Sequence, residues 1–97
     1  MKVDLRSVHF DLSEESKQYL MTKIERIGYA KDMIVDLLFV FTKDAKNYKL
    51  EVTANFRWGV QAHLQETAFE INPGIDILMD KLANKLVREK EKIQERK

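Results

Sequence analysis

The chain has 97 residues, of which 44% are hydrophobic and 34% are charged, and its formal net charge is +1. This length supports one domain with one core, which we expect to extend over residues 1–97. The absence of cysteine excludes a disulfide framework, a thiolate nucleophile and a cysteine-bound zinc site. No apolar stretch reaches the length of a membrane-spanning helix, and the N-terminus MKVDLRSVHF lacks the apolar run of a signal peptide. We therefore expect a cytoplasmic protein.

The first half of the chain predicts a strand, a helix and a second strand. Apolar and charged residues alternate over residues 2–8, which predicts a strand with one buried face. Ser13 is a suitable N-cap for a helix that ends at about Ile27, and Gly28 can supply a left-handed C-terminal turn. Residues 34–42, IVDLLFVFT, are β-branched and aromatic, which favours a second strand.

Two further strands are predicted in the second half of the chain. Apolar residues alternate with polar ones over residues 48–56, so the apolar set should face a core. The segment 57–59, Arg-Trp-Gly, predicts a hairpin turn. Residues 60–66 then form the next predicted strand, with Val60 facing inward.

A long final helix completes the predicted elements. Asn72 is expected to cap it, and Pro73 to open it at the first helical position, where proline is tolerated. The helix should continue to the mid-90s, and its end is expected to fray from about residue 91.

The order β-α-β-β-β-α predicts an α+β fold. A right-handed crossover would make the first two strands parallel, and the hairpins would continue the sheet antiparallel. Both helices have apolar stripes that need a cover, so we expect them to pack on one face of a four-stranded mixed sheet. Leu38 and Val40 would then lie on the open face of that sheet.

The final helix is predicted to carry a stripe of cations. Four of them, at spacings of i, i+4, i+7 and i+11, fall within roughly 60° on a helix surface: Lys81, Lys85, Arg88 and Lys92. An apolar stripe runs beside them, formed by Leu78, Leu82, Leu86 and Ile93. Residues 81–97 carry a formal charge of +4 and residues 1–80 carry −3. This segregation favours a surface that binds polyanions such as nucleic-acid phosphates. The alternative is a solvated helix face with i,i+4 support, for example from Glu89.

Few other residues suggest chemistry. Trp58, the only tryptophan, could stack on a base or fold over its own hairpin. His9 and His63 are far apart, and no spacing indicates a metal site. Ser13 has no evident partner for nucleophilic catalysis, and no glycine-rich phosphate loop is present. We therefore predict neither a cofactor nor enzymatic activity.

An ordered set of segments gives the chain a family resemblance. It comprises the strand YKLEVTANF, the turn at Gly59, the strand VQAHLQ, Ile75-Asp76, Asp80-Lys81-Leu82 and the basic run ending in KEKI. In the first helix, the segment from Lys23 to Ile27 matches the same pattern. Together these segments resemble the short ribosome hibernation promoting factors, a family that includes the ribosome-associated translation inhibitors also labelled sigma-54 modulation proteins.

The resemblance implies a fold similar to double-stranded-RNA-binding domains and a protein that binds in the decoding channel of the small ribosomal subunit. There it would block mRNA and tRNA during stress or stationary phase. The implied partner is the small subunit with its rRNA, without a membrane or a small-molecule substrate, and the protein should be monomeric off the ribosome. The implied rRNA-binding residues are Lys23, Arg26, Lys81, Arg88, Lys90 and Lys92. We add Lys85 because it completes the stripe.

The chain departs from the family pattern at several positions. Asn72 replaces a tyrosine found in many members, Asn84 replaces a common arginine, and Glu66 stands where a small apolar residue is usual. Two alternatives to ribosome binding stay open. One is a domain that binds structured RNA away from ribosomes, and the other is a protein-interaction domain that uses the long helix.

Overall fold

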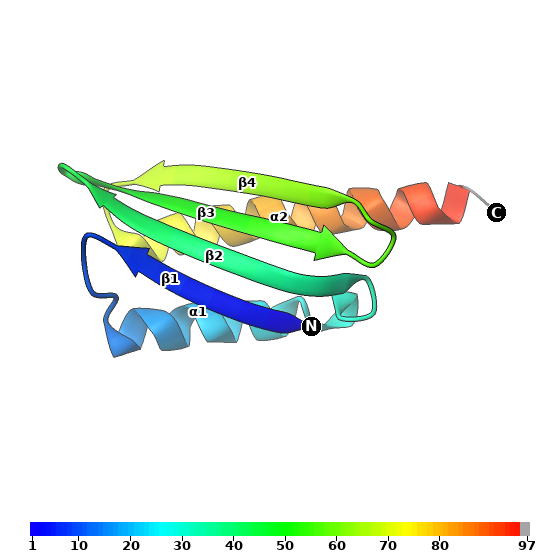
Figure 1. The fold of residues 1–97 in the computed structure, drawn as a ribbon, viewed down its shortest axis with the longest axis horizontal. Coiled ribbons are helices and arrows are strands. Elements are labelled where there is room, and N and C mark those ends of the chain that lie inside the picture. The colour runs from blue at the N-terminus through cyan, green and yellow to red at the C-terminus, as the bar shows by residue number, and fades with distance from the viewer. Residues whose placement is uncertain (96–97) are drawn as a thin grey trace.

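The computed structural model describes the backbone of residues 1–95 and the side chains of residues 1–92. The predicted order β-α-β-β-β-α is confirmed, with one short 3-10 helix added after the first helix (Figure 1). The elements are β1 (Lys2–Val8), α1 (Glu14–Arg26), the 3-10 helix η1 (Gly28–Ala30), β2 (Ile34–Asp44), β3 (Asn47–Phe56), β4 (Gln61–Ala68) and α2 (Ile71–Glu95).

The four strands form one mixed sheet in the order β1-β2-β3-β4. β1 runs parallel to β2, while β3 and β4 add antiparallel, as the crossover and the hairpins predict. Leu5 pairs with Phe39, Phe39 with Val52 and Val52 with Leu64, so one row of apolar side chains crosses the whole sheet. Both helices lie on this face of the sheet (Figure 1).

The core lies between the sheet and the two helices. Leu37, Phe39 and Phe41 of β2 are fully buried there, as their alternation predicts. They belong to one hydrophobic cluster with Leu20 of α1 and Leu82 of α2. The opposite sheet face is polar.

The open sheet face is held by side-chain hydrogen bonds between strands. Asn55 donates to Asp36 at 2.6 Å, and Gln61 donates to Asn55 at 2.9 Å. Leu38 and Val40 lie on this face, as predicted, and they are half-buried among its polar residues. Cross-strand pairs of this kind fix the register of a sheet.

The N-terminus of α1 is capped as predicted, because Ser13 Oγ accepts the backbone N–H of Ser16 at 3.1 Å. The left-handed turn predicted at Gly28 is wrong. The chain passes through Ile27 directly into η1, and the N–H of Ala30 donates to the Ile27 carbonyl at 2.9 Å. This extra turn leads to the buried Ala30.

The boundaries of β4 differ from the prediction at the hairpin. Gly59 has a φ of 86°, which supports the predicted turn. Val60, however, belongs to the turn, where its carbonyl accepts the N–H of Phe56 at 2.8 Å. Val60 is 40% exposed, so its predicted inward position is wrong.

The start of α2 also differs from the prediction. The helix begins at Ile71, so Asn72 lies inside the first turn and is not the cap. The Asn72 side chain instead accepts a hydrogen bond from Ser16 Oγ of α1 at 2.9 Å. Pro73 also lies in the first turn. The N–H groups of this turn have no partner within the helix, so a proline there costs no helical hydrogen bond.

Gly74 is buried against β3 and β4, and a Cβ atom there would lie 2.8 Å from Ala68 Cβ.

α1 and α2 run side by side and parallel, with both N-termini at the same end of the molecule (Figure 1). α2 is the longer helix and extends past the end of the sheet, so the molecule measures 47 × 20 × 20 Å. Fraying from about residue 91 stays a prediction, since the helix is described through Glu95. No helix among the described residues is long and apolar enough to cross a membrane.

Candidate nucleic-acid interface

The predicted cationic stripe of α2 lies on the flank of the helix that faces β4. Lys81, Lys85 and Arg88 line a shallow groove there, together with Leu64 of β4 and Asn84. The apolar side of α2, centred near Leu82, is buried on the sheet, and this burial orients the neighbouring side of the helix toward β4. The spacing that groups the cations therefore also places them beside the edge strand.

The cations of α1 lie on the other flank of α2. Lys23 and Arg26 line a second groove between the two helices, and Asp76 and Asp80 of α2 line its opposite side. Lys90 lies two turns after Ala83, a residue of this groove, and so on the same side of α2. The residues predicted to bind rRNA thus form two groups, one on each flank of α2, and the groove between the helices contains both signs of charge.

Asp76 ties the two helices together within this second groove. Its Oδ1 atom accepts a hydrogen bond from the Tyr19 hydroxyl at 2.6 Å and lies 3.0 Å from the Lys23 ammonium. The hydrogen bonds from Tyr19 and Lys23 hold the pKa of Asp76 below its ordinary value. The Asp76 carboxylate in turn raises the pKa of Lys23. Lys23 therefore has a structural role in addition to any contact with a phosphate.

An Asp76→Asn variant tests this contact through its pH dependence. The pKa of Asp76 is lower in the folded chain than the ordinary value of 3.8, so its stabilising effect is present above that value and disappears as the pH falls through the folded-state pKa. We expect the variant to melt below the wild-type temperature at pH 7, and the difference to shrink below about pH 4. Since the Asp76 side chain is 43% exposed, solvent screening keeps the effect modest.

Thermal unfolding followed by circular dichroism between pH 2.5 and 7 gives this measurement. Asp80→Asn is the matched control, because Asp80 lines the same groove but makes no such hydrogen bonds within residues 1–92. A melting difference that does not change with pH would contradict the assignment.

Glu89 is the charged residue that the sequence placed wrongly. The alternative interpretation expected it to give i,i+4 support on a solvated face. An i,i+4 pair with Lys85 is present, but Glu89 is only 3% exposed and does not lie on a solvated face. Its Oε2 atom lies 3.4 Å from Lys85 Nζ and 3.2 Å from Lys92 Nζ. The angles are outside those of a well-formed hydrogen bond, so these contacts are ion pairs. Its position three residues after Leu86, in line with the apolar stripe, is the sequence signal for its burial.

Burial alone would raise the pKa of Glu89, because a carboxylate loses its hydration in the interior. The neighbouring ammonium groups of Lys92 and Lys85 outweigh this effect and lower the pKa, with a smaller contribution from the Trp58 side chain. Glu89 is therefore a buried anion at neutral pH. The Glu89 carboxylate holds the ammonium groups of Lys85 and Lys92, and these two positive charges offset the cost of burying the carboxylate.

Trp58 folds over its own hairpin, which is the structural alternative that the sequence left open. Its ring stacks on Phe56 with a centroid distance of 5.1 Å and an angle of 23°. The indole also makes a small contribution to the lowered pKa of Glu89, which lies towards the C-terminal end of α2. Trp58 as a whole residue is 38% exposed, and its stacking on Phe56 covers one face of the ring.

The seven predicted site residues differ in how much of their charge is already neutralised. Lys81 donates to the Gln65 carbonyl at 2.9 Å and lies 3.3 Å from Glu66 Oε1, a contact that the sequence did not predict. Lys23, Lys85 and Lys92 also have carboxylate partners, as described above. The members with no ion pair among the described residues are exposed on α1 or α2: Arg26, Arg88 and Lys90. These three side chains carry the least compensated positive charge of the set.

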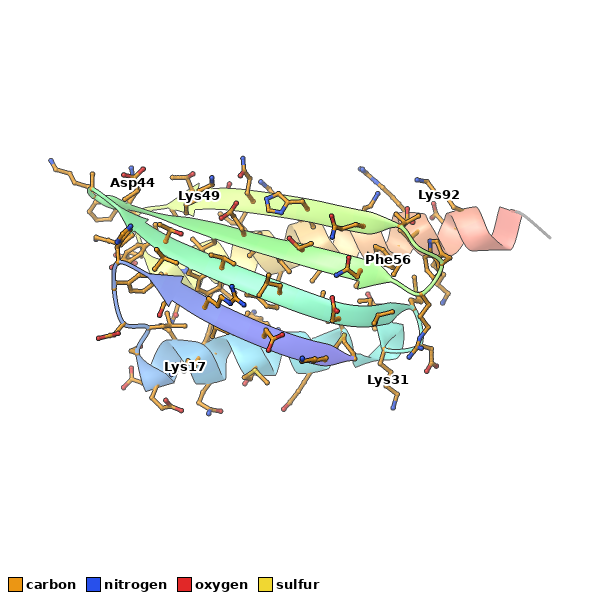
Figure 2. All side chains as sticks on the ribbon, in the orientation of Figure 1. Lys17, Lys31, Asp44, Lys49, Phe56 and Lys92 are labelled. Carbon is orange, nitrogen blue, oxygen red and sulfur yellow. The ribbon has the colours of Figure 1, made fainter. Side chains whose placement is uncertain are left out.

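The cationic stripe of α2 extends from Lys81, beside Gln65 and Glu66 of β4, to Lys92 near one end of the molecule. Lys92 and Lys31 lie at the same end as Phe56 and the β3–β4 hairpin, and Asp44 lies at the opposite end (Figure 2). No three His, Cys, Asp or Glu side chains within the described residues gather in an arrangement that could hold a metal ion. The geometry therefore offers contacts to anions on a surface of α2, α1 and the hairpin.

Comparison with known proteins defines the class to which this fold and surface belong. Residues 3–94 match the model of a family described as "Sigma 54 modulation protein / S30EA ribosomal protein". The chain therefore belongs to this family, and the resemblance inferred from its sequence is confirmed.

Particular relatives agree with this assignment. The chain is 27% identical over 96 residues to a protein of Azotobacter vinelandii named ribosome hibernation promoting factor, covering 99% of this chain and 89% of that protein. The fold is similar to a ribosomal subunit interface protein from Coxiella burnetii, with a TM-score of 0.86, 20% identity and coverage of 94% of this chain and 99% of that one. It is also similar to the N-terminal domain of Protein Y from Thermus thermophilus, with a TM-score of 0.78, 18% identity and coverage of 91% and 98%.

Proposed function

We propose that this chain is a ribosome hibernation factor that binds rRNA in the decoding channel of the small ribosomal subunit and blocks access of mRNA and tRNA. Its family and the names of its relatives indicate the broader class of ribosome hibernation or subunit interface proteins. The channel and the rRNA contact follow from the family resemblance together with the cationic surface of the two helices.

The observation that carries the proposal is the presence, along both flanks of α2, of exposed cations without an ion pair within residues 1–92. Arg88 on one flank and Arg26 on the other make no ion pair among the described residues. A guanidinium group donates several hydrogen bonds in a plane and suits phosphate oxygens. A domain with cations on both flanks can contact phosphate tracks on two sides, as a folded rRNA channel presents them.

The proposed mechanism is steric and electrostatic and involves no reaction. The folded domain occupies the channel, and cations on its two helices bind rRNA phosphates. Each phosphate contact displaces condensed counterions, so binding should weaken steeply as salt increases. On this proposal the protein is a cytoplasmic, non-enzymatic monomer when it is off the ribosome.

Co-sedimentation with purified small ribosomal subunits tests the proposal. The protein is expected to pellet with subunits at low salt and less at moderate salt. Saturating mRNA with initiator tRNA should displace it, because they would occupy the same channel. Binding that these ligands leave unchanged would place the protein elsewhere on the subunit. Binding to free duplex RNA but not to subunits would instead favour the structured-RNA alternative.

A further inference from the structure

Three of the four lysines and arginines in the stripe of α2 are held by carboxylates of the same chain. Lys81 is paired with Glu66 of β4 at 3.3 Å. Lys85 and Lys92 both converge on one oxygen of Glu89, at 3.4 and 3.2 Å. Among the described residues, Arg88 is the member of the stripe without an internal ion pair. Two carboxylates thus offset much of the charge that the spacing of the cations would otherwise present.

These two carboxylates are not ordinary surface acids. The Glu89 side chain is 3% exposed and Glu66 is 24% exposed, whereas the lysines that they hold are 28% to 60% exposed. The anions therefore lie beneath the cations, between them and the body of the protein. A phosphate approaching from solvent meets the ammonium groups first. Burial holds Glu89 in place, and Glu66 is partly covered beside Lys81.

We propose that Glu66 and Glu89 are built-in counter-anions that hold down the affinity of the α2 stripe for phosphates. The proposal rests on the proposed function, since it concerns the same RNA-binding surface. An ammonium group has three N–H donors, so each lysine can still contact a phosphate while it is paired. The nearby negative charge nevertheless reduces the gain from each contact.

The proposal identifies Glu66 and Glu89 as residues that limit binding to RNA in general. Non-specific binding to nucleic acid is almost entirely electrostatic. A stripe whose positive charge is partly neutralised should therefore bind isolated duplexes weakly. Stable binding then needs the additional contacts of Arg26, Arg88 and Lys90, on both flanks of α2. An RNA surface that surrounds the helix can supply them together, whereas one duplex presents phosphates to a single side.

Glu89→Gln and Glu66→Gln test the proposal with a labelled 20-base-pair RNA duplex as the probe. Each substitution keeps the shape of the side chain and removes one negative charge. We expect each to raise the affinity about 3-fold at ~0.1 M salt, and the double variant about 10-fold. The slope of log affinity against log salt should also steepen, by up to about one for each cation released. Fluorescence anisotropy at four salt concentrations measures both quantities.

Glu91→Gln is the matched control. Glu91 lies on the same helix, two residues from Glu89, and the substitution changes the net charge equally. Glu91 is exposed, however, and makes no ion pair among the described residues. We expect its affinity to change less than 2-fold, because an exposed charge is screened by solvent and salt.

The outcomes separate the counter-anion role from its alternatives. Equal effects of the Glu89, Glu66 and Glu91 variants would show a simple change in net charge and overturn the proposal. Weaker binding by folded Glu89→Gln and Glu66→Gln would overturn the proposal, because it would show that the carboxylates position the lysines for binding. Absence of duplex binding by every variant would also overturn the proposal. Should Glu89→Gln fail to fold, Glu66→Gln carries the test alone, since Glu66 lies on a different element. The probe is free RNA, so failure to bind subunits would count against the proposed function and not against this inference.

Discussion

Replacing both Arg26 and Arg88 with glutamate is expected to lower the affinity for small ribosomal subunits by at least about 100-fold. Each arginine is exposed and makes no ion pair among the described residues, so its charge is available to a phosphate. A hydrogen bond to a charged group contributes about 1.5 to 3 kcal/mol, and each reversal adds repulsion. Quantitative pelleting at several salt concentrations measures the loss, together with a shallower salt dependence.

The choice of these two positions follows from the contacts of the other cations. A glutamate at Lys92 would place a second carboxylate beside the buried Glu89, which lies 3.2 Å from the lysine ammonium. Such a variant could lose binding through loss of stability. Arg6→Glu is the matched control for Arg26 and Arg88, because Arg6 is exposed on the open sheet face, away from both helices. Equal losses from the control and from the double variant would contradict the proposed interface.

Replacing Gly74 with valine is expected to lower the free energy of unfolding by about 3 kcal/mol. A Cβ atom at this position would lie 2.8 Å from Ala68 Cβ and 3.1 Å from Leu50 Cδ1. Both neighbours belong to the sheet and are held by the strand register, so α2 would have to move away from β3 and β4. Urea unfolding would show the loss, and the melting temperature should fall by more than about 10 °C.

Gly28→Val is the control for this prediction. A Cβ atom at Gly28 would meet nothing within 4 Å, so only the small conformational cost of a β-branched residue is expected there. If both valine variants lost equal stability, the close approach of α2 to the sheet could not be the cause.

The strands were predictable because each has one buried face. Leu37, Phe39 and Phe41 alternate with less buried residues, and this pattern gives both the strand and the side that faces the core. The first turn of α2 was less predictable. Asn72 followed by Pro73 is a strong local signal for a helix start, but Asn72 bonds to Ser16 of α1. A contact 56 residues away in sequence thus takes the side chain that a cap would have used.

The candidate site shows a similar division between local and long-range information. Helical spacing correctly grouped the four cations of the α2 stripe on one flank, since that depends only on residues of the same helix. It could not show that Glu66 would lie next to Lys81, because this contact depends on where β4 packs. Nor could it show that Lys23 and Arg26 would lie on the other flank. Glu89 was missed because charge is a weaker guide to burial than position within the apolar stripe.

The parallel arrangement of α1 and α2 has a consequence for the electric field around the molecule. A helix carries roughly half a positive charge at its N-terminus and half a negative charge at its C-terminus, and here the two macrodipoles point the same way. Lys23 and Arg26 lie in the last turn of α1 and Lys92 in that of α2, while Glu14 and Glu15 occupy the first turn of α1. The side chains thus oppose the backbone dipole at both ends of α1 and at the C-terminal end of α2. A distant polyanion therefore meets a weaker field than the formal charges imply, and attraction becomes strong only at contact distance.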